Sequence, residues 1–255
     1  MPCVFVGHGN PMNGIEDNDY TRGWSQLGVA LPRPRAILSV SAHWYVPGSR
    51  VTANDRPPTI HDFGGFPKAL YEVEYPAPGL PELAEQVSDL LAPVPVQRDE
   101  GWGIDHGTWS VLVHMFPRAD VPVVQLAIDE TVSPEEHHAL ARRLRPLREE
   151  GVLILGSGNV VHNLHTYAWG RHSTEPYDWA VRFETRVRHL IAARELDPIV
   201  SYPTLGPDAA LAAPTPDHYL PLLYVLGLWC DDEPVTFPVD GFDGGSVSML
   251  AMRCG

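Results

Sequence analysis

Residues 152–158, VLILGSG, form an apolar run that ends in small and polar residues, and this run is the most informative segment for the fold. Two other runs share the pattern, VFVG at 4–7 and AILSVSA at 36–42. Strands buried on both faces of a parallel sheet are continuous apolar runs of this kind, without the alternation of a half-exposed strand. VPVVQLAI at 121–128 and SVSMLAM at 246–252 predict two more strands of the same type.

Helical patterns separate these runs. The segment 133–150 opens with SPEE, a helix N-cap followed by proline and acidic residues in the first turn. Apolar residues recur at three- and four-residue spacing in 81–92 and 176–195, and 216–229 is apolar enough to predict a buried helix. Strands that alternate with helices predict an α/β fold, with one domain over residues 1–255 and a central, mostly parallel sheet flanked by helices.

Charge and cysteine content exclude several classes of partner. The 255 residues include 32 Asp and Glu against 18 Lys and Arg, a formal net charge of -14. Nucleic acids and anionic membranes need a basic face, so neither is expected as a partner. The three cysteines suit a reducing compartment rather than a disulfide framework. No signal peptide or membrane span is predicted, so we expect a cytoplasmic protein.

Histidines stand at the carboxyl ends of the predicted strands. His8 and His43 each follow an apolar run directly. His162 lies shortly after the third run, and His218 opens the most apolar helical segment. Sites in parallel sheets form beyond the carboxyl ends of the strands, so these four imidazoles are expected to converge on a metal site. Imidazole binds Zn, Fe, Cu and Ni, so the ligand type does not select the metal. For each histidine taken alone, a hydrogen-bonded structural role stays open.

Two loops add candidate residues. The segment 105–109, DHGTW, follows a glycine-rich turn and precedes a short helical pattern. It either presents His106 into a cleft or caps the helix through Asp105 or Thr108. The segment 61–67, HDFGGFP, either rims a pocket or makes a turn.

The other histidines carry no motif. His137 and His138 lie in a charged helical segment and are predicted to be solvated. His114 lies in an apolar helical segment and is predicted to be buried. The others, His165, His172 and His189, are predicted to lie on the surface.

Six segments occur in the order found in one enzyme family. They resemble the class III extradiol ring-cleavage dioxygenases of the LigB superfamily, in particular the DOPA 4,5-dioxygenase branch, and run from residue 7 to about residue 227. Each segment alone is a weak signal, and their order makes the resemblance specific. The segments are GHGNPM, SAHW, TIHDFGGFPKALYEVEYPAPG, DHGTWSVL, GSGNVVHNL and PTPDHYLPLLYVLG.

The resemblance implies a mononuclear metal site at the strand ends. His8 and His43 correspond to metal ligands, and His218 to the third metal-site residue of the branch. His162 corresponds to the catalytic base, which can itself bind the metal in zinc-loaded forms. His106 corresponds to the second active-site histidine of the wider class.

The third ligand departs from the wider class, which uses two histidines and one carboxylate. His218 stands where the carboxylate is expected, as it does throughout the DOPA-type branch. The charge balance of the site is therefore open, and Asp217 stays open as a substitute ligand.

The implied reaction opens the ring of a catechol beside its two hydroxyls and incorporates both atoms of O2, giving a muconic semialdehyde. Fe(II) is expected for activity, because Zn(II) has no redox role, although Zn(II) can occupy the site in a purified or crystallised protein. His162 is expected to act as base and later as acid, with His106 as a second donor that stabilises charge. The expected partners are a small aromatic diol and O2, and the family often forms small homo-oligomers.

The substrate pocket is weakly specified by the sequence. Lys68 and Arg50 are candidates for binding a substrate carboxylate. Aromatic residues in or beside the motif loops either stack on a substrate ring or pack internally. They are Trp44, Tyr45, His61, Phe63, Phe66 and Trp109.

Two other functions compete with ring cleavage. The first is a Zn-dependent hydrolase on the same four-histidine site, which is disfavoured because no obvious carboxylate base joins the motifs. The second is a non-enzymatic binding protein like the related Memo proteins. Retention of His162 and His106 beside the three implied ligands favours catalysis.

Overall fold

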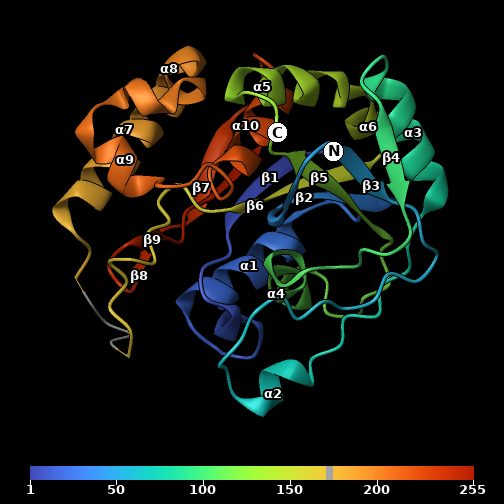
Figure 1. Ribbon diagram of the computed structural model, residues 1–255, viewed down its shortest axis with the longest axis horizontal. Helices are drawn as coiled ribbons and strands as arrows, with labels where there is room; N and C mark the ends of the chain where they lie inside the picture. The colour runs from blue at the N-terminus through green and yellow to red at the C-terminus, as the bar shows by residue number, and fades with distance from the viewer. Residues whose placement is uncertain (171–174) are drawn as a thin grey trace.

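The computed structural model describes residues 1–170 and 175–255. An eight-stranded sheet with the order β4-β3-β5-β2-β6-β1-β10-β7 runs through the centre (Figure 1). A two-stranded hairpin, β8 (Phe242–Asp243) with β9 (Val247–Ser248), lies outside it. The strands of the large sheet are β1 (Cys3–Gly7), β2 (Ala36–Val46), β3 (Ser49–Thr52), β4 (Val96–Asp99), β5 (Val123–Asp129), β6 (Val152–Gly158), β7 (Val235–Val239) and β10 (Ala251–Cys254).

The middle of the sheet is parallel, as predicted: β5, β2, β6 and β1 pair in the same direction. The prediction for 246–252 is wrong in direction and extent. This stretch contains β9 and the start of β10, and β10 pairs antiparallel with both β1 and β7. A parallel neighbour needs a crossover, usually through a helix, and no helix lies between β7 and β10.

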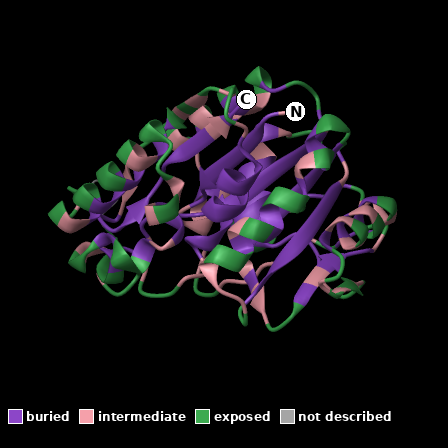
Figure 2. Ribbon diagram, turned by 90° about the horizontal axis from the view of Figure 1, so that it is seen from above, coloured by how far each residue is buried: buried purple, intermediate pink, exposed green. Residues whose placement is uncertain are grey.

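Helices cover both faces of the sheet, and each face has its own hydrophobic core. Figure 2 shows the central strands buried along most of their length while the outer faces of the helices are exposed. One face carries α1 (Asp19–Ala30), α2 (Lys68–Tyr71), α4 (His106–Met115) and the short 3-10 helix η1 (Pro11–Gly14). The other carries α3 (Pro81–Leu91), α5 (Pro134–Arg143), α6 (Arg145–Glu149), α7 (Asp178–Ala193), α8 (Leu196–Val200), α9 (Pro207–Ala212), α10 (Leu220–Leu228) and the 3-10 helix η2 (Tyr202–Leu205).

Most predicted helices are present, with one interruption. The segment 133–150 is divided at Leu144 into α5 and α6. Pro146 explains the division, because proline has no N–H to donate within a continuous helix. The expected N-cap is present: Ser133 and Glu136 form a reciprocal capping box at the start of α5.

The GSG end of β6 allows the chain to pack closely around the site. An added Cβ at Gly156 would lie 2.5 Å from the carbonyl oxygen of Pro221, and one at Gly158 would lie 2.2 Å from that of His218. Only glycine permits such contacts, so the segment that carries His218 lies directly against β6. Gly158 is level with Gly7 at the end of β1, so His8 and His218 meet at one edge of the sheet.

The described residues contain no helix that is both long enough and apolar enough to cross a membrane.

Candidate metal centre and active site

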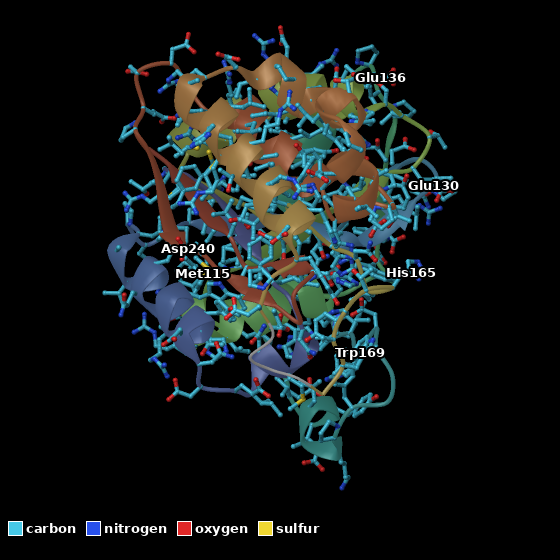
Figure 3. All side chains as sticks on the ribbon, turned by 90° about the vertical axis from the view of Figure 1, so that its left-hand side faces the viewer. Met115, Glu130, Glu136, His165, Trp169 and Asp240 are labelled. Atoms are coloured by element: carbon cyan, nitrogen blue, oxygen red, sulfur yellow. The ribbon has the colours of Figure 1, made fainter. Side chains whose placement is uncertain are left out.

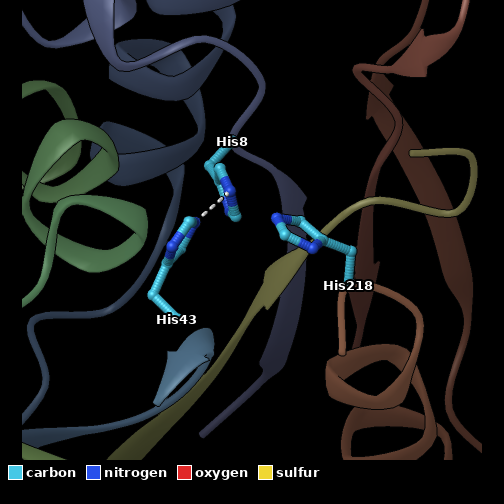
Figure 4. A group of neighbouring side chains, drawn as sticks. All are labelled: His8, His43 and His218. Atoms are coloured by element: carbon cyan, nitrogen blue, oxygen red, sulfur yellow. Dashed lines mark hydrogen bonds between the residues drawn. The ribbon is translucent and has the colours of Figure 1, made fainter. Parts of the chain in front are cut away.

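Three histidines from separate parts of the chain meet at the carboxyl ends of β1, β2 and β6. His8 follows β1, His43 lies in β2, and His218 precedes α10. One ligand nitrogen from each lies within 4.8 Å of the others. The Nε2 atoms of His8 and His43 are 3.1 Å apart, and Figure 4 shows the ring of His218 turned toward the same point. These are three of the four histidines that the sequence predicts at the metal site, and their role as ligands stays a prediction.

The hydrogen-bond partner of Nδ1 on each ring determines whether Nε2 is free to bind a cation. Nδ1 of His8 lies 3.0 Å from Oγ of Ser157, whose hydroxyl donates to a main-chain carbonyl, so Nδ1 of His8 must donate. Nδ1 of His218 contacts a carboxylate oxygen of Asp217. Nδ1 of His43 lies 3.1 Å from Oδ2 of Asp62.

Each neutral ring therefore carries its proton on Nδ1 and a lone pair on Nε2. A carboxylate or hydroxyl partner on the outer nitrogen is the usual arrangement for a metal-binding histidine.

The three rings suit a divalent cation. Two facing lone pairs 3.1 Å apart repel each other unless a proton or a cation lies between them. Burial, followed by the charges of neighbouring histidines, holds the pKa of His8 and of His218 well below the usual value, so both stay neutral ligands. Burial opposes protonation of His43 too, but Asp62 and Asp105 outweigh it and raise the pKa of His43. A metal would therefore displace any proton held between the Nε2 atoms of His8 and His43.

His162 stacks on His218, with ring centroids 3.4 Å apart and an interplanar angle of 3°. Its ring has no hydrogen-bond partner among the described residues, and burial lowers its pKa to about 4. Two groups of ligand atoms converge among the described residues, one of His8, His43 and His218 and one of His43, Asp62 and His106, and neither includes His162. A neutral imidazole without partners beside a metal site suits proton transfer, and ligation by His162 stays a prediction.

His106 is the first residue of α4, and both interpretations of the DHGTW segment hold. Asp105 is the N-cap and accepts from the N–H of Thr108. His106 faces the site, with its ring centroid 3.9 Å from that of His43. Burial and the charge of His43 lower the pKa of His106, against the opposing effect of Asp62. The start of α4 therefore does both: Asp105 caps the helix, and His106 presents its imidazole to the site.

Asp62 is a site residue that the sequence analysis did not single out. It lies in the loop between β3 and α2, and its carboxylate contacts His43 and His106. Burial alone would raise the pKa of Asp62, but these two contacts lower it, so the group is ionised. Asp62 thus places a carboxylate in the site, where the sequence analysis found no obvious carboxylate base. Both oxygens of Asp62 face imidazoles, however, so neither is free to activate a water molecule as a hydrolase base would.

A cavity of about 230 Å³ opens above the histidines. Of the six aromatic residues proposed from the sequence, Phe63 and Phe66 line it. Trp44 instead stacks on Trp102, and Trp109 is fully buried and donates to a main-chain carbonyl. Tyr45 packs against a hydrophobic core, and His61 bonds to the carbonyl of Val73. The complete lining is His8, Gly9, Asn10, Pro11, His43, Asp62, Phe63, Phe66, His106, His162, Leu164, Tyr167, Trp169, His218 and Val247.

The loop after β6 supplies cavity residues that had no sequence signal. Leu164, Tyr167 and Trp169 come from this loop, which lies at the edge of the molecule (Figure 3). The hydroxyl of Tyr167 donates to Asp243 at 2.7 Å. Trp169 is 62% exposed. Isolated aromatic residues in a loop have no periodicity, so only the fold shows that they border the cavity.

The two basic candidates lie away from the cavity. Lys68 pairs with Glu72 at 2.9 Å, and its side chain is 89% exposed. Arg50 lies in β3 and pairs with Asp99 at 3.5 Å. Neither belongs to the cavity lining.

The remaining histidines give mixed outcomes. His137 was predicted to be solvated but is fully buried, and its two nitrogens bond to the hydroxyl of Tyr224 and the carbonyl of Asp129. His138 is half-buried, and so is His114, which bonds to a main-chain carbonyl. His165 and His189 are exposed, as predicted, and His172 lies outside the described residues.

Comparisons with known proteins identify the family of this chain. Residues 3–243 match the family described as the catalytic LigB subunit of aromatic ring-opening dioxygenase. The chain is 52% identical over 259 residues to a 4,5-DOPA dioxygenase extradiol of Escherichia coli (strain K12), covering 100% of this chain and 95% of that protein. It is 35% identical over 251 residues to a 4,5-DOPA dioxygenase extradiol of Beta vulgaris, covering 96% and 92%.

A crystal structure of an uncharacterized protein from Escherichia coli K12 has the same fold, with a TM-score of 0.88, 47% identity and complete coverage of both chains. Identity at this level over the whole length is far above what a shared fold alone would give. The protein therefore belongs to the LigB family of extradiol aromatic ring-opening dioxygenases and is an oxidoreductase homologous to the 4,5-DOPA dioxygenases.

Proposed function

We propose that this protein opens the ring of a DOPA-like catechol with O2, and that Fe(II) is its working metal. The observation that supports this most directly is the convergence of His8, His43 and His218 beneath an aromatic-walled cavity, with two more imidazoles beside them. Two relatives that cover nearly the whole chain are 4,5-DOPA dioxygenases.

The size of the cavity supports a small aromatic substrate. At about 230 Å³ it is below the ~300–1,000 Å³ that is typical of sites for drug-sized ligands. Phe63 and Phe66 meet edge to face, with centroids 5.4 Å apart, and form one wall. Such rings pack well against a single catechol ring.

His8, His43 and His218 would hold the metal on one side, which leaves its other positions open toward the cavity. The chemistry that Fe(II) supplies in such a site is electron exchange with O2, which Zn(II) does not support. Zn(II) would compete for the same three nitrogens in a purified protein. Asp217 contacts Nδ1 of His218, so we assign it to the outer side of that ring rather than to the ligand set.

His162 and His106 would take part in proton transfer and charge stabilisation during the reaction. The ring of His162 borders the cavity and has no hydrogen-bond partner in the described part of the chain, so it can accept a proton from a catechol hydroxyl and later return it. His106 lies on the other side of the site against Asp62, with Nε2 as an acceptor, so it would stabilise negative charge on the substrate only after taking up a substrate proton at that nitrogen. The aromatic side chains in the wall lower the local dielectric constant, which strengthens both interactions.

Oxygen uptake tests the proposal. Apo protein is loaded anaerobically with Fe(II) and ascorbate, and air is admitted with L-DOPA, dopamine, caffeate or unsubstituted catechol. We expect Fe(II)-dependent uptake with a yellow product that contains both oxygen atoms. Zn(II)-loaded protein and the His43→Ala variant serve as controls. Uptake that is equal in Zn(II)-loaded protein, or absent for every catechol while bound Fe(II) is confirmed, would refute the proposal.

The remaining assignments are proposals as well. We assign residues 1–255 to one catalytic domain and a cytoplasmic location, for which the cysteine content is the main support. A small homo-oligomer is expected from the family, and sedimentation analysis would test it.

A further inference from the structure

We propose that Asp62 is a positioning residue that holds a metal ligand, His43, and a substrate-facing histidine, His106, in one fixed arrangement. This inference rests on the proposed metal site. It adds that a single carboxylate, supplied by a loop distant in sequence, determines which nitrogen each of the two rings presents to the site.

The contacts of Asp62 divide cleanly between its two oxygens. Oδ2 lies 3.1 Å from Nδ1 of His43. Oδ1 accepts the main-chain N–H of His106 at 2.9 Å, and it also lies 2.9 Å from Nδ1 of His106 in an electrostatic contact whose direction is not that of a hydrogen bond. The Asp62 side chain is only 18% exposed, so solvent replaces none of these partners easily. The carboxylate thus bridges two rings that themselves lie 3.9 Å apart.

An ionised carboxylate fixes the tautomers of both rings. A lone pair on either Nδ1 would face an anionic oxygen at about 3 Å, which is repulsive. Both Nδ1 atoms therefore carry protons, and both Nε2 atoms are left as acceptors. In His43 this frees the nitrogen that faces His8, and in His106 it frees the nitrogen directed away from Asp62.

The same loop also builds the substrate wall. Phe63, the next residue, lies edge to face against His106 with centroids 5.3 Å apart. Asp62 therefore sets the position of the loop that carries Phe63 relative to the histidines. A substitution at Asp62 is expected to change both the metal affinity and the shape of the cavity.

Asp217 provides a matched control within the same site. It is also a carboxylate on a metal-facing histidine, and its side chain is 20% exposed. Its one contact in the described structure is Nδ1 of His218, through one oxygen. An amide at position 217 can turn its oxygen toward that ring and keep the tautomer.

Position 62 does not allow this adjustment. In Asp62→Asn the N–H of His106 retains the amide oxygen at Oδ1, so the amide N–H₂ faces Nδ1 of His43. Donor then meets donor, and His43 must move its proton to Nε2, where the metal would bind. Asp62→Asn and Asp217→Asn each remove one negative charge. A difference in Zn(II) affinity between the two variants therefore reports the bridging of two rings by Asp62 and not the loss of a charge.

The experiment compares wild type, Asp62→Asn and Asp217→Asn by Zn(II) affinity, measured in competition with a chelator. Ring ¹⁵N NMR of the metal-free proteins at mildly alkaline pH reports the histidine tautomers. Circular dichroism checks that each variant is folded. We expect Asp62→Asn to weaken Zn(II) binding by about 10–100-fold, in the range found for outer partners of metal-binding histidines, and to add an Nε2–H histidine signal. Asp217→Asn should lose less affinity and keep the wild-type tautomer pattern.

The outcomes separate this inference from the proposed function. Wild type that binds no Zn(II) would overturn the metal site and the inference together. Tight binding by wild type with equal losses in the two variants, or an unchanged tautomer pattern in a folded Asp62→Asn variant, would overturn the role of Asp62 alone.

Discussion

Glu184 makes the folding stability of this protein depend on pH. It lies in α7, is 5% exposed, and accepts the hydroxyl of Ser248 at 2.5 Å. Burial raises its pKa from 4.5 to about 7, while Ser248 and Arg188 oppose the rise and Asp240 adds to it. The carboxyl is therefore protonated in the folded protein at pH values where it is ionised in the unfolded chain.

The sign and size of the effect follow from proton linkage. Between pH 4.5 and about 7 the folded state binds more protons at this site than the unfolded state, so the free energy of unfolding falls as pH rises. One pKa unit is worth about 1.36 kcal/mol, so the rise to about 7 corresponds to a loss of about 3 kcal/mol. This is a large part of the ~5–15 kcal/mol that stabilises a typical domain.

Glu184→Gln removes the titration and keeps the shape and the acceptor for Ser248. Urea unfolding of both proteins should give similar stability at about pH 5, and the variant should be more stable by up to about 3 kcal/mol at about pH 8. Glu85→Gln, at an exposed position on α3, controls for the loss of a carboxyl. A stability difference between Glu184→Gln and wild type that does not change with pH, or that favours wild type at high pH, would refute the reasoning.

The other predictions concern the metal centre. Gly107→Ala should lower Zn(II) affinity, because the added Cβ would lie 2.7 Å from Cδ2 of His43; Gly64→Ala, with nothing within 4 Å, should leave the affinity unchanged. Equal affinities in these two variants would contradict the packing argument. His8→Ala should abolish metal retention in elemental analysis, and full occupancy would argue against it as a ligand. His162→Ala should keep much of its metal and lose turnover, so near-normal oxygen uptake would remove His162 from the mechanism.

The local pattern of the chain was enough to predict the centre of the sheet and the convergence of His8, His43 and His218. Apolar runs that end in glycine and serine specify buried parallel strands, because such strands lose water on both faces. Parallel strands end at one edge of a sheet, so His8 and His43 at two strand ends had to approach each other. The DHGTW segment likewise contains its own N-cap, since Asp105 and Thr108 lie within one helical turn.

Pairings between distant segments were decided by the tertiary structure alone. His137 is buried because α5 packs on α10, which brings Tyr224 within 3.0 Å of its ring. The antiparallel direction of β10 depends on which strand it pairs with, and its own residues do not encode that choice. Trp169 borders the cavity only because its loop folds back over the strand ends.

Asp62 shows most clearly why contacts between distant segments could not be predicted from the sequence. The sequence by itself determined that histidines would gather at the strand ends, because strand and helix periodicities are local properties of the chain. It did not determine which nitrogen of each ring would be free. That depends on a carboxylate that lies 19 residues after His43 in the chain yet within 3.1 Å of it in the fold. Tautomer and charge are set by the atoms that packing brings into contact, and these contacts exist only in the folded protein.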